Sequence, residues 1–402
     1  MQRRKLSAGI RPLPLLTHST RHAHVDSPPG RARCRHHPRR SRLGTTGGDA
    51  LSGMIVIMKL LVLGGTWFVG RVVAEQAVAR GWDVTIFNRG RSGPAPTGAA
   101  EIHGDRENVV DLKRLAASGP WDAVVDVPGS VPTVVRDSVR ALQPVVERYV
   151  FVSTVSAYRA WPHEPVSEES VLHPGDPDWD PGFRHWDAAA YGPLKAGCEA
   201  AIRRDLPEEQ SLILRPGVVL GPYEYVGRMR WWLGRVRQGG GVLAPGDPGR
   251  TIQPVDVRDV GRFLLDMTES RQSGVYNVAP PAGGATFADL LHHCIVATRA
   301  DAEIVWVDED WLIEHGVRQW TEMPLWRKGA GTWAMDTRRA RAAGLRCRQL
   351  RDTVADTWSW LSQGGEPVAH ERDAEHGITV HKERELLAGA VRDGAIVART
   401  CP

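Results

Sequence analysis

The sequence of 402 residues predicts an α/β protein, a doubly wound parallel sheet with a smaller C-terminal lobe. Three observations indicate this fold class. Short apolar runs alternate with stretches of helical spacing, the first run passes directly into a glycine-rich turn, and the regularity fades after Pro222. Such alternation is typical of parallel strands that are joined by right-handed helical crossovers.

The regular part of the sequence begins at Met58. Its first expected strand, KLLVL, is a short, continuous apolar run, as in a parallel strand buried on both faces. A stretch with helical spacing follows and ends at Gly81. Strands are expected at 59–63, 83–87, 99–103, 123–127, 149–153 and 211–215, and further helical stretches at 134–146 and 191–204.

These elements suggest a domain of residues 58–362. Its cofactor-binding part is expected at 58–216 and a substrate lobe mainly at 217–362. Residues 363–402 are polar and are expected to form a tail with one candidate helix at 381–391.

The composition excludes several classes of protein. No run approaches the 18 apolar residues of a membrane span, so we expect no membrane partner. The five cysteines include no CxxC pair, which argues against a disulfide scaffold or a zinc ribbon, predicts no metal site and fits a cytoplasmic location.

Residues 1–57 carry the positive charge of the chain. They hold 11 Lys and Arg against 2 acidic residues, a charge of +9, whereas the whole chain has +4, so the remainder has −5. We therefore expect no nucleic-acid partner for the body. The segment lacks apolar periodicity and is expected to be disordered.

Three origins of this basic extension stay open. It is a transit peptide, a polyanion-binding segment around RARCRHHPRR, or upstream sequence with translation starting at Met54 or Met58. We favour the last, because 45 Arg against 6 Lys suggests GC-rich coding DNA, where spurious upstream extensions are common.

The glycine-rich turn predicts a Rossmann-type nucleotide site. A tight turn between strand and helix needs glycine so that the backbone can approach a diphosphate, and the helix N-terminus offers free N–H groups. The alternative is an ordinary strand–helix turn. The expected cofactor-binding residues of the turn are Gly64, Gly65, Thr66, Trp67, Phe68, Val69 and Gly70.

Two further groups suggest acid–base chemistry. Tyr191 and Lys195 are four residues apart, so on a helix they share a face, and a nearby ammonium would lower the pKa of the phenol. Ser153 and Thr154 follow the fifth strand, where the carboxyl ends of parallel strands face the ligand. The alternatives are an exposed Tyr–Lys pair and hydroxyls that only form a turn.

Together these residues resemble the short-chain dehydrogenase/reductase superfamily, and within it the extended branch, the NAD-dependent epimerase/dehydratase family. The resemblance covers about residues 58–362. The motifs that carry it are GGTWFVG (64–70), YVFVSTVSAY (149–158), YGPLK (191–195), LRPGVVLGP (214–222), QPVDVRDV (253–260) and GVYNV (274–278).

The resemblance implies roles for particular residues. The hydroxyl lies four positions before Tyr158, which gives Thr154; Tyr191 is the acid/base; Lys195 binds the nicotinamide ribose and tunes Tyr191. Asp105 lies near the adenine. The catalytic set is thus Thr154, Tyr191 and Lys195.

The sequence also departs from the family pattern. Trp67 replaces the middle glycine of the turn, as in atypical extended members, some of which are reductases and some RNA-binding plastid proteins. Val218 stands where nucleotide-sugar enzymes carry asparagine, and Ile252 where they carry a basic residue, with Arg250 two positions earlier. Both changes weaken the case for a nucleotide-sugar substrate.

Six tryptophans fall in the expected lid and lobe segments. They either line a pocket for a flat or apolar substrate or pack in the core and at its rim. These residues are Trp161, Trp179, Trp186, Trp231, Trp232 and Trp326.

The end of the second strand bears on the cofactor. A carboxylate there binds the ribose hydroxyls of NAD, but this sequence has neutral Asn88 followed by Arg89 and Arg91. Arginine suits phosphate oxygens, so we expect NADP to be preferred over NAD. The alternative is that both arginines are solvated and Asn88 tolerates either cofactor.

The leading functional hypothesis is an NAD(P)-dependent reductase or dehydrogenase that acts on a small-molecule carbonyl or alcohol. The alternatives are a nucleotide-sugar epimerase or dehydratase, and a non-catalytic nucleotide- or RNA-binding protein on the same fold. We expect a monomer or a homodimer.

Overall fold

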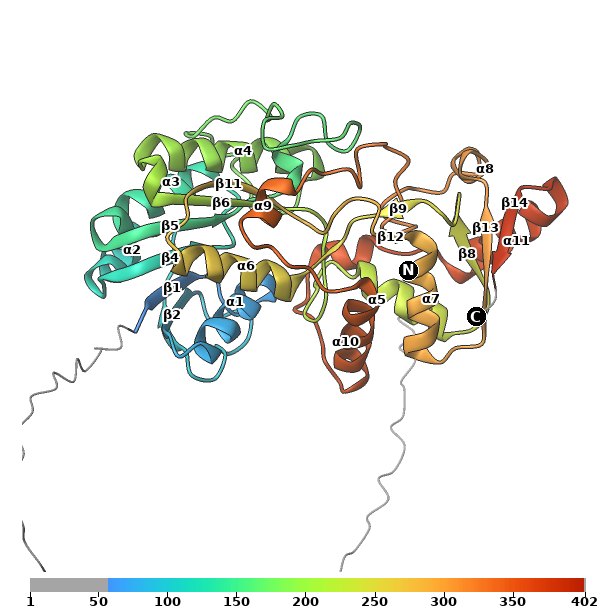
Figure 1. Cartoon of the computed structure of the whole chain (residues 1–402), viewed down its shortest axis with the longest axis horizontal. Coiled ribbons are helices and arrows are strands. Elements are labelled where there is room, and N and C mark those ends of the chain that lie inside the picture. The colour runs from blue at the N-terminus through green and yellow to red at the C-terminus, as the bar shows by residue number, and fades with distance from the viewer. Residues whose placement is uncertain (1–56, 401–402) are drawn as a thin grey trace, which may run out of the picture. The chain divides into compact units, whose positions relative to one another are not determined.

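The computed structural model describes residues 57–400, so the expectations for the basic extension lie outside the described part, apart from its last residue. A seven-stranded parallel sheet forms the main domain, in the order β11-β6-β5-β4-β1-β2-β3 (Figure 1). The strands are β1 Lys59–Leu63, β2 Asp83–Asn88, β3 Ala100–His103, β4 Trp121–Asp126, β5 Val146–Val152, β6 Ser211–Pro216 and β11 Gly274–Val278. The predicted fold class is confirmed.

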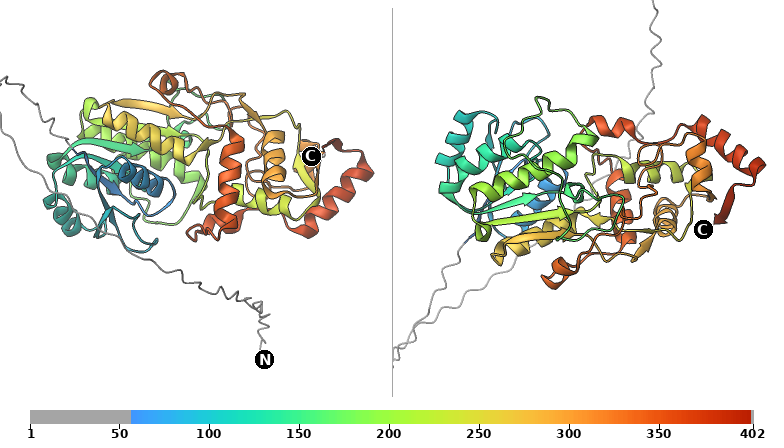
Figure 2. Two further views of the ribbon diagram at one scale, coloured as in Figure 1. Left: turned by 60° about the horizontal axis from the view of Figure 1, so that its bottom comes forward. Right: turned by 90° about the horizontal axis from the view of Figure 1, so that it is seen from above.

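Helices cover both faces of this sheet (Figure 2). On one face lie α1 (Phe68–Ala79) and α6 (Val257–Glu269), and on the other α2 (Val109–Ala117), α3 (Pro132–Leu142) and α4 (Ala188–Asp205). The alternation of β1 explains this arrangement. Leu60 and Val62 are buried in the first core, whereas Leu61 and Leu63 are buried in the second.

The chain enters the lobe after β6 and returns to the sheet with α6 and β11. The return places residues 257–278 with the cofactor-binding part in space, although they follow residue 216 in sequence. Local periodicity does not reveal such a return, because it reports an element and not its neighbours.

The lobe has its own buried core, which includes Trp232, Trp306 and Trp326. Its helices are α5 (Arg228–Arg237), α7 (Phe287–Thr298), α10 (Leu350–Ser362) and α11 (Val380–Asp393), and its sheet has the order β14-β13-β8, with β8 Gly240–Pro245, β13 Ala302–Val307 and β14 Ile396–Thr400. The candidate helix at 381–391 is present as α11. Residues 380–400 therefore contribute a helix and a strand to the lobe.

Shorter elements connect these parts. They are β7 Val219–Leu220, β9 Thr251–Ile252, β10 Val255–Asp256, β12 Ala285–Thr286, α8 Glu309–Glu314, α9 Arg338–Ala342, and the 3-10 turns η1 Gln143–Val145, η2 Val155–Ala157, η3 Glu208–Gln210 and η4 Glu371–Glu375. Within residues 57–400, no helix is both long and apolar enough for a membrane span, and no group of His, Cys, Asp or Glu could hold a metal ion.

Candidate active site

The glycine-rich turn joins β1 to α1 and requires glycine at two positions. Gly64 and Gly65 have φ of +94° and +76°, which side chains rarely tolerate. A Cβ on Gly65 would lie 2.8 Å from the Ile86 side chain, and a Cβ on Gly70 would lie 2.8 Å from the Gly65 nitrogen. Helix α1 therefore starts close to the strands. Its first turn carries no acidic residue, so its N–H groups suit a diphosphate.

Trp67, which precedes α1, turns its ring towards the lobe. The ring centroid lies 4.5 Å from that of Tyr225 and 5.4 Å from that of His370. Its indole Nε1 is buried and has no hydrogen-bond partner among the described residues. The residues of the turn thus fit a dinucleotide, with the bulky Trp67 ring packed against aromatic neighbours.

A carboxylate of the neighbouring strand β3, Glu101, lies beside the end of β2, where the sequence predicts none. Asn88 Nδ2 donates to Glu101 Oε1 at 2.6 Å, and His103 Nε2 lies 3.2 Å from the other oxygen. The Arg89 side chain is exposed. Asp105, on the loop after β3, accepts a hydrogen bond from the Glu107 N–H at 3.0 Å.

The two hydroxyl residues after β5 have different surroundings. Ser153 Oγ donates to Glu199 Oε1 at 2.5 Å, and Glu199 also accepts from Arg215 Nε at 2.9 Å. Arg215 in turn donates to the Tyr158 hydroxyl at 2.8 Å. This buried network holds β5, α4 and β6 together and occupies Ser153, which supports Thr154 as the hydroxyl of the site.

Helix α4 brings Tyr191 close to Thr154. Asp187 caps the helix by accepting from the N–H groups of Ala189 and Ala190. Gly192 allows the close approach, because a Cβ there would lie 2.4 Å from the carbonyl oxygen of Ser156, whose N–H donates to Thr154 Oγ1. Sequence reasoning missed Gly192, since a glycine inside a helix carries no signal of which backbone it approaches.

Lys195 is buried at 3% exposure and faces backbone carbonyls. Its Nζ donates to Gly129 O at 2.6 Å and to Val152 O at 2.7 Å, and it lies 4.1 Å from the centre of the Phe151 ring. Burial lowers the pKa of its ammonium. Lys195 therefore joins the loop after β4 to the end of β5, and it does not hydrogen-bond to Tyr191 in the described structure.

The cations that act on Tyr191 come from the lobe. Burial raises the pKa of the Tyr191 phenol, whereas Arg372, a hydrogen-bonding interaction with Thr154, and Arg228 lower it; the net direction is upward. Trp186 lies between Tyr191 and Arg372, with its ring centroid 4.8 Å from that of Tyr191 and the Arg372 guanidinium 3.8 Å from its ring. Neither arginine was predicted, because nothing in their spacing marks them.

The six tryptophans divide between site and core. Trp186 contacts Tyr191, and Trp161 packs edge-to-face on Trp320 at 6.3 Å. Trp232 and Trp326 are buried in the lobe core, and Trp231 packs on Trp232. Trp179 is half-buried.

The two residues that depart from the pattern of nucleotide-sugar enzymes, Val218 and Ile252, have structural roles. Val218 and Ile252 are buried in the lobe core, and Arg250 pairs with Glu309 at 2.6 Å.

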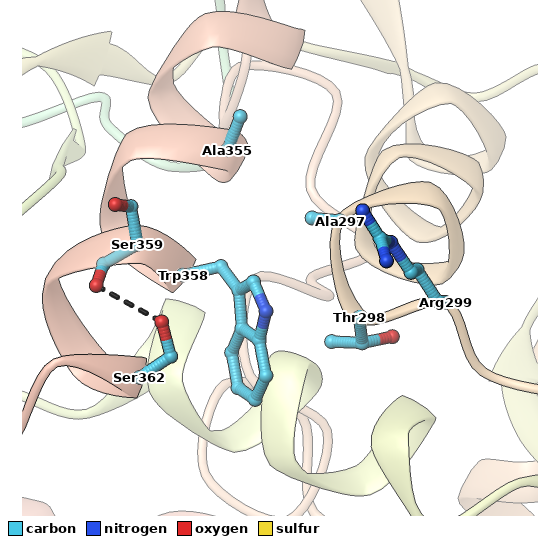
Figure 3. Close-up of a pocket in the computed structure, with 7 residues that line it drawn as sticks. All are labelled: Ala297, Thr298, Arg299, Ala355, Trp358, Ser359 and Ser362. Atoms are coloured by element: carbon cyan, nitrogen blue, oxygen red, sulfur yellow. Dashed lines mark hydrogen bonds between the residues drawn. The ribbon is translucent and has the colours of Figure 1, made fainter.

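Two surface hollows lie away from Tyr191 and the glycine-rich turn. One, of about 440 Å³, lies between α7 and α10 and is lined by Trp358, Arg299 and small or hydroxyl side chains (Figure 3). The other, of about 650 Å³, lies where β9, β12 and the segment before α10 meet. Asp256, Asp289 and His293 line the second hollow, and neither hollow is lined by Thr154, Tyr191 or Lys195.

Comparison with known proteins places this site in context. No protein-family model matches the chain. The chain is 24% identical over 255 residues to the chloroplast stem-loop binding protein of 41 kDa b of Arabidopsis thaliana, covering 60% of this chain and 63% of that protein. It is 28% identical over 248 residues to the epimerase family protein SDR39U1 of Bos taurus, covering 58% and 78%. The chain thus spans less than two thirds of the first relative.

Solved structures share the fold over about three quarters of the chain. The Bordetella bronchiseptica enzyme WbmH, in complex with NAD⁺, aligns with a TM-score of 0.59 at 18% identity, covering 77% of this chain and all 100% of that one. A UDP-glucose 4-epimerase of Thermotoga maritima, with UDP-glucose, aligns with a TM-score of 0.56 at 20% identity, covering 77% and 100%. The resemblance to the epimerase/dehydratase branch of the short-chain dehydrogenases/reductases is confirmed at the level of fold.

Proposed function

We propose that this chain is an NAD(P)-dependent reductase or dehydrogenase that transfers a hydride to or from a small-molecule carbonyl or alcohol. The observation that supports it is the meeting of Thr154 and Tyr191 at the carboxyl end of β5. Tyr225 contacts the Trp67 ring and lies close to Tyr191, so the candidate cofactor turn and the phenol share a neighbour.

Each residue has a distinct role in this proposal. The nicotinamide cofactor supplies or accepts the hydride. Thr154 and Tyr191 donate hydrogen bonds to the substrate oxygen, which stabilises the negative charge that develops there, and Tyr191 gives up its proton to that oxygen. Lys195 uses two of its three N–H groups on backbone carbonyls, which leaves one for a ribose hydroxyl.

We further propose that NADP is preferred over NAD and that Arg89 is the main discriminator. The exposed guanidinium is free to bind a 2′-phosphate, and Asn88 brings no charge. Glu101 acts against this preference, but its oxygens contact Asn88 and His103, which reduces their repulsion of a phosphate.

The second candidate is a nucleotide-sugar epimerase or dehydratase. It is favoured by a structural neighbour whose complex contains NAD and UDP. The buried Val218 and Ile252 count against it, since the family pattern has polar groups there. A non-catalytic RNA-binding role, suggested by the name of one relative, fits poorly with a body of net charge −5.

One experiment separates these candidates. The purified protein is mixed with NADPH or NADH and a panel of aldehydes, ketones and UDP-hexoses, while the absorbance of the reduced nicotinamide and the products are followed. A reductase consumes one reduced cofactor for each product formed. Conversion of a UDP-hexose without net cofactor consumption would refute the reductase proposal and favour the epimerase.

A further inference from the structure

The segment around η4, residues 370–377, lies against the candidate active site. His370 packs on Tyr225 at 4.8 Å and on Trp67 at 5.4 Å between ring centroids. The Trp186 N–H donates to the Glu371 carboxylate. This segment follows residue 362, where the family resemblance in the sequence ends, so it adds side chains that the shared motifs do not supply.

Two arginines meet there with little compensating charge. Arg228, the first residue of α5, is only 8% exposed, and its nearest carboxylate, Glu224, lies 3.6 Å away. Glu224 also accepts from the N–H groups of Arg228 and Met229. Among residues 57–400, no carboxylate forms a salt bridge with Arg372.

The acidic neighbours of Arg372 in sequence have other partners. Glu371 accepts from the Trp186 N–H, and Asp373 pairs with Arg230. Burial and the neighbouring Arg372 lower the pKa of Arg228 to about 10, so Arg228 stays charged at neutral pH.

Several buried polar atoms in this cluster have no hydrogen-bond partner in the part of the chain that the structure describes. They are Nε of Arg228, Nε of Arg372, both ring nitrogens of His376, and Nε1 of Trp67. Burial and the two arginines lower the pKa of His376 to about 4, so it is neutral and offers one donor. Such an excess of donors matches a ligand that carries several acceptor oxygens.

We propose that Arg228, Arg372 and His376 bind an oxyanion of the substrate, a carboxylate or a phosphate, beside Tyr191. This proposal rests on the proposed function only for the placement of the reacting oxygen at Tyr191. It specifies the substrate class: a carbonyl or alcohol compound with an anionic group that is held by the C-terminal segment.

The test is anion binding, which needs no turnover. Inorganic pyrophosphate and oxalate are titrated separately by calorimetry into the protein in the presence of saturating NADP⁺, which competes for the glycine-rich turn. The variants are Arg372→Gln, Arg228→Gln and, as a matched control on α5, Arg237→Gln, whose guanidinium lies over Trp358 at 5.3 Å. Thermal unfolding checks that each variant folds.

We expect the wild type and Arg237→Gln to bind at least one anion with equal affinity, and Arg372→Gln to bind it at least about tenfold more weakly, the scale of a lost charge-assisted contact. Binding of pyrophosphate alone identifies a phosphate, and of oxalate alone a carboxylate. If the Arg228→Gln variant does not fold because Arg228 is buried, the Arg372→Gln variant, at a partly exposed residue, decides the result. Absence of binding in the wild type, or equal binding in Arg372→Gln, would overturn the proposal while leaving the reductase proposal intact.

Discussion

At the scale of single residues, the surroundings of Tyr191 determine whether its phenol is protonated and can therefore donate a proton. Burial outweighs Arg372, Thr154 and Arg228, so the pKa of the phenol is raised and it is protonated at neutral pH. A protonated phenol is ready to give a proton to a developing alkoxide, which suits reduction.

This gives a prediction for catalysis. Tyr191→Phe should abolish turnover and leave cofactor affinity nearly unchanged, because it removes the proton but little volume. In the wild type, kcat/KM for reduction should stay constant through neutral pH and fall only above the ordinary phenol pKa of 10.0, since the proton is lost as the pH passes the raised value. Wild-type turnover in Tyr191→Phe would contradict the assignment.

Lys195 should contribute to stability as well as to cofactor binding. Lys195→Met leaves two buried carbonyl oxygens without their donor, so we expect unfolding by denaturant to show a loss of about 1–3 kcal/mol, together with a higher KM for cofactor and a lower kcat. Lys113→Met, on the exposed side of α2, is the control and should change stability by no more than about 0.5 kcal/mol. A stable Lys195→Met with normal cofactor binding would remove both roles.

Arg89 tests the cofactor preference. Arg89→Ala should weaken NADPH binding by about 1.5–3 kcal/mol, the scale of a charge-assisted hydrogen bond, and leave NADH binding almost unaffected. Titration of both cofactors into the wild type, this variant and the control Arg91→Ala measures the difference. Equal affinities in the wild type, or equal losses for both cofactors, would rule out this discriminator.

At the scale of elements, the site depends on how closely α4 approaches η2. Gly192→Ala places a Cβ 2.4 Å from the Ser156 carbonyl oxygen, so the helix or the turn must shift and separate Tyr191 from Thr154. We expect a loss of turnover and a lower Tm. Gly234→Ala, within α5, is the matched control: its Cβ meets no atom within 4 Å, and alanine there should be neutral or stabilising by about 0.5–1 kcal/mol. Similar effects in both variants would show that close packing at Gly192 is unimportant.

The same scale shows what the sequence could predict. All six expected strands are present. Five of them are mainly apolar runs such as KLLVL, whose composition predicts a buried strand, whereas β3 (AEIH) has no buried residue. The motif GVYNV forms strand β11, which the sequence pattern does not place in the sheet, because its partner β6 lies about sixty residues earlier. Likewise, spacing predicts Tyr191 and Lys195 and the family resemblance predicts Thr154, whereas only the packing of the lobe brings Arg228 and Arg372 to the candidate site.

At the scale of the whole described molecule, the last described residues of the chain complete the core of the lobe. Trp306 is fully buried, and its indole donates to Thr400 Oγ1 of β14 at 3.1 Å. Glu383 of α11 is 3% exposed and binds Arg235 Nε at 2.6 Å and the Leu243 N–H at 3.1 Å. The segment 380–400, although polar in composition, thus contributes buried contacts to α5, β8 and β13.

Removal of residues 366–402 should therefore lower the stability of the lobe. The truncated chain loses β14 from the edge of β13, exposes the apolar surface beneath Leu386 and Ala390, and leaves Arg235 without Glu383. We expect a markedly lower Tm and binding of a hydrophobic dye. The milder Leu386→Ala, in the full chain, should cost about 2–5 kcal/mol by the cavity it creates. A truncated chain with the Tm of the full chain would mean that α11 and β14 contribute nothing to the lobe.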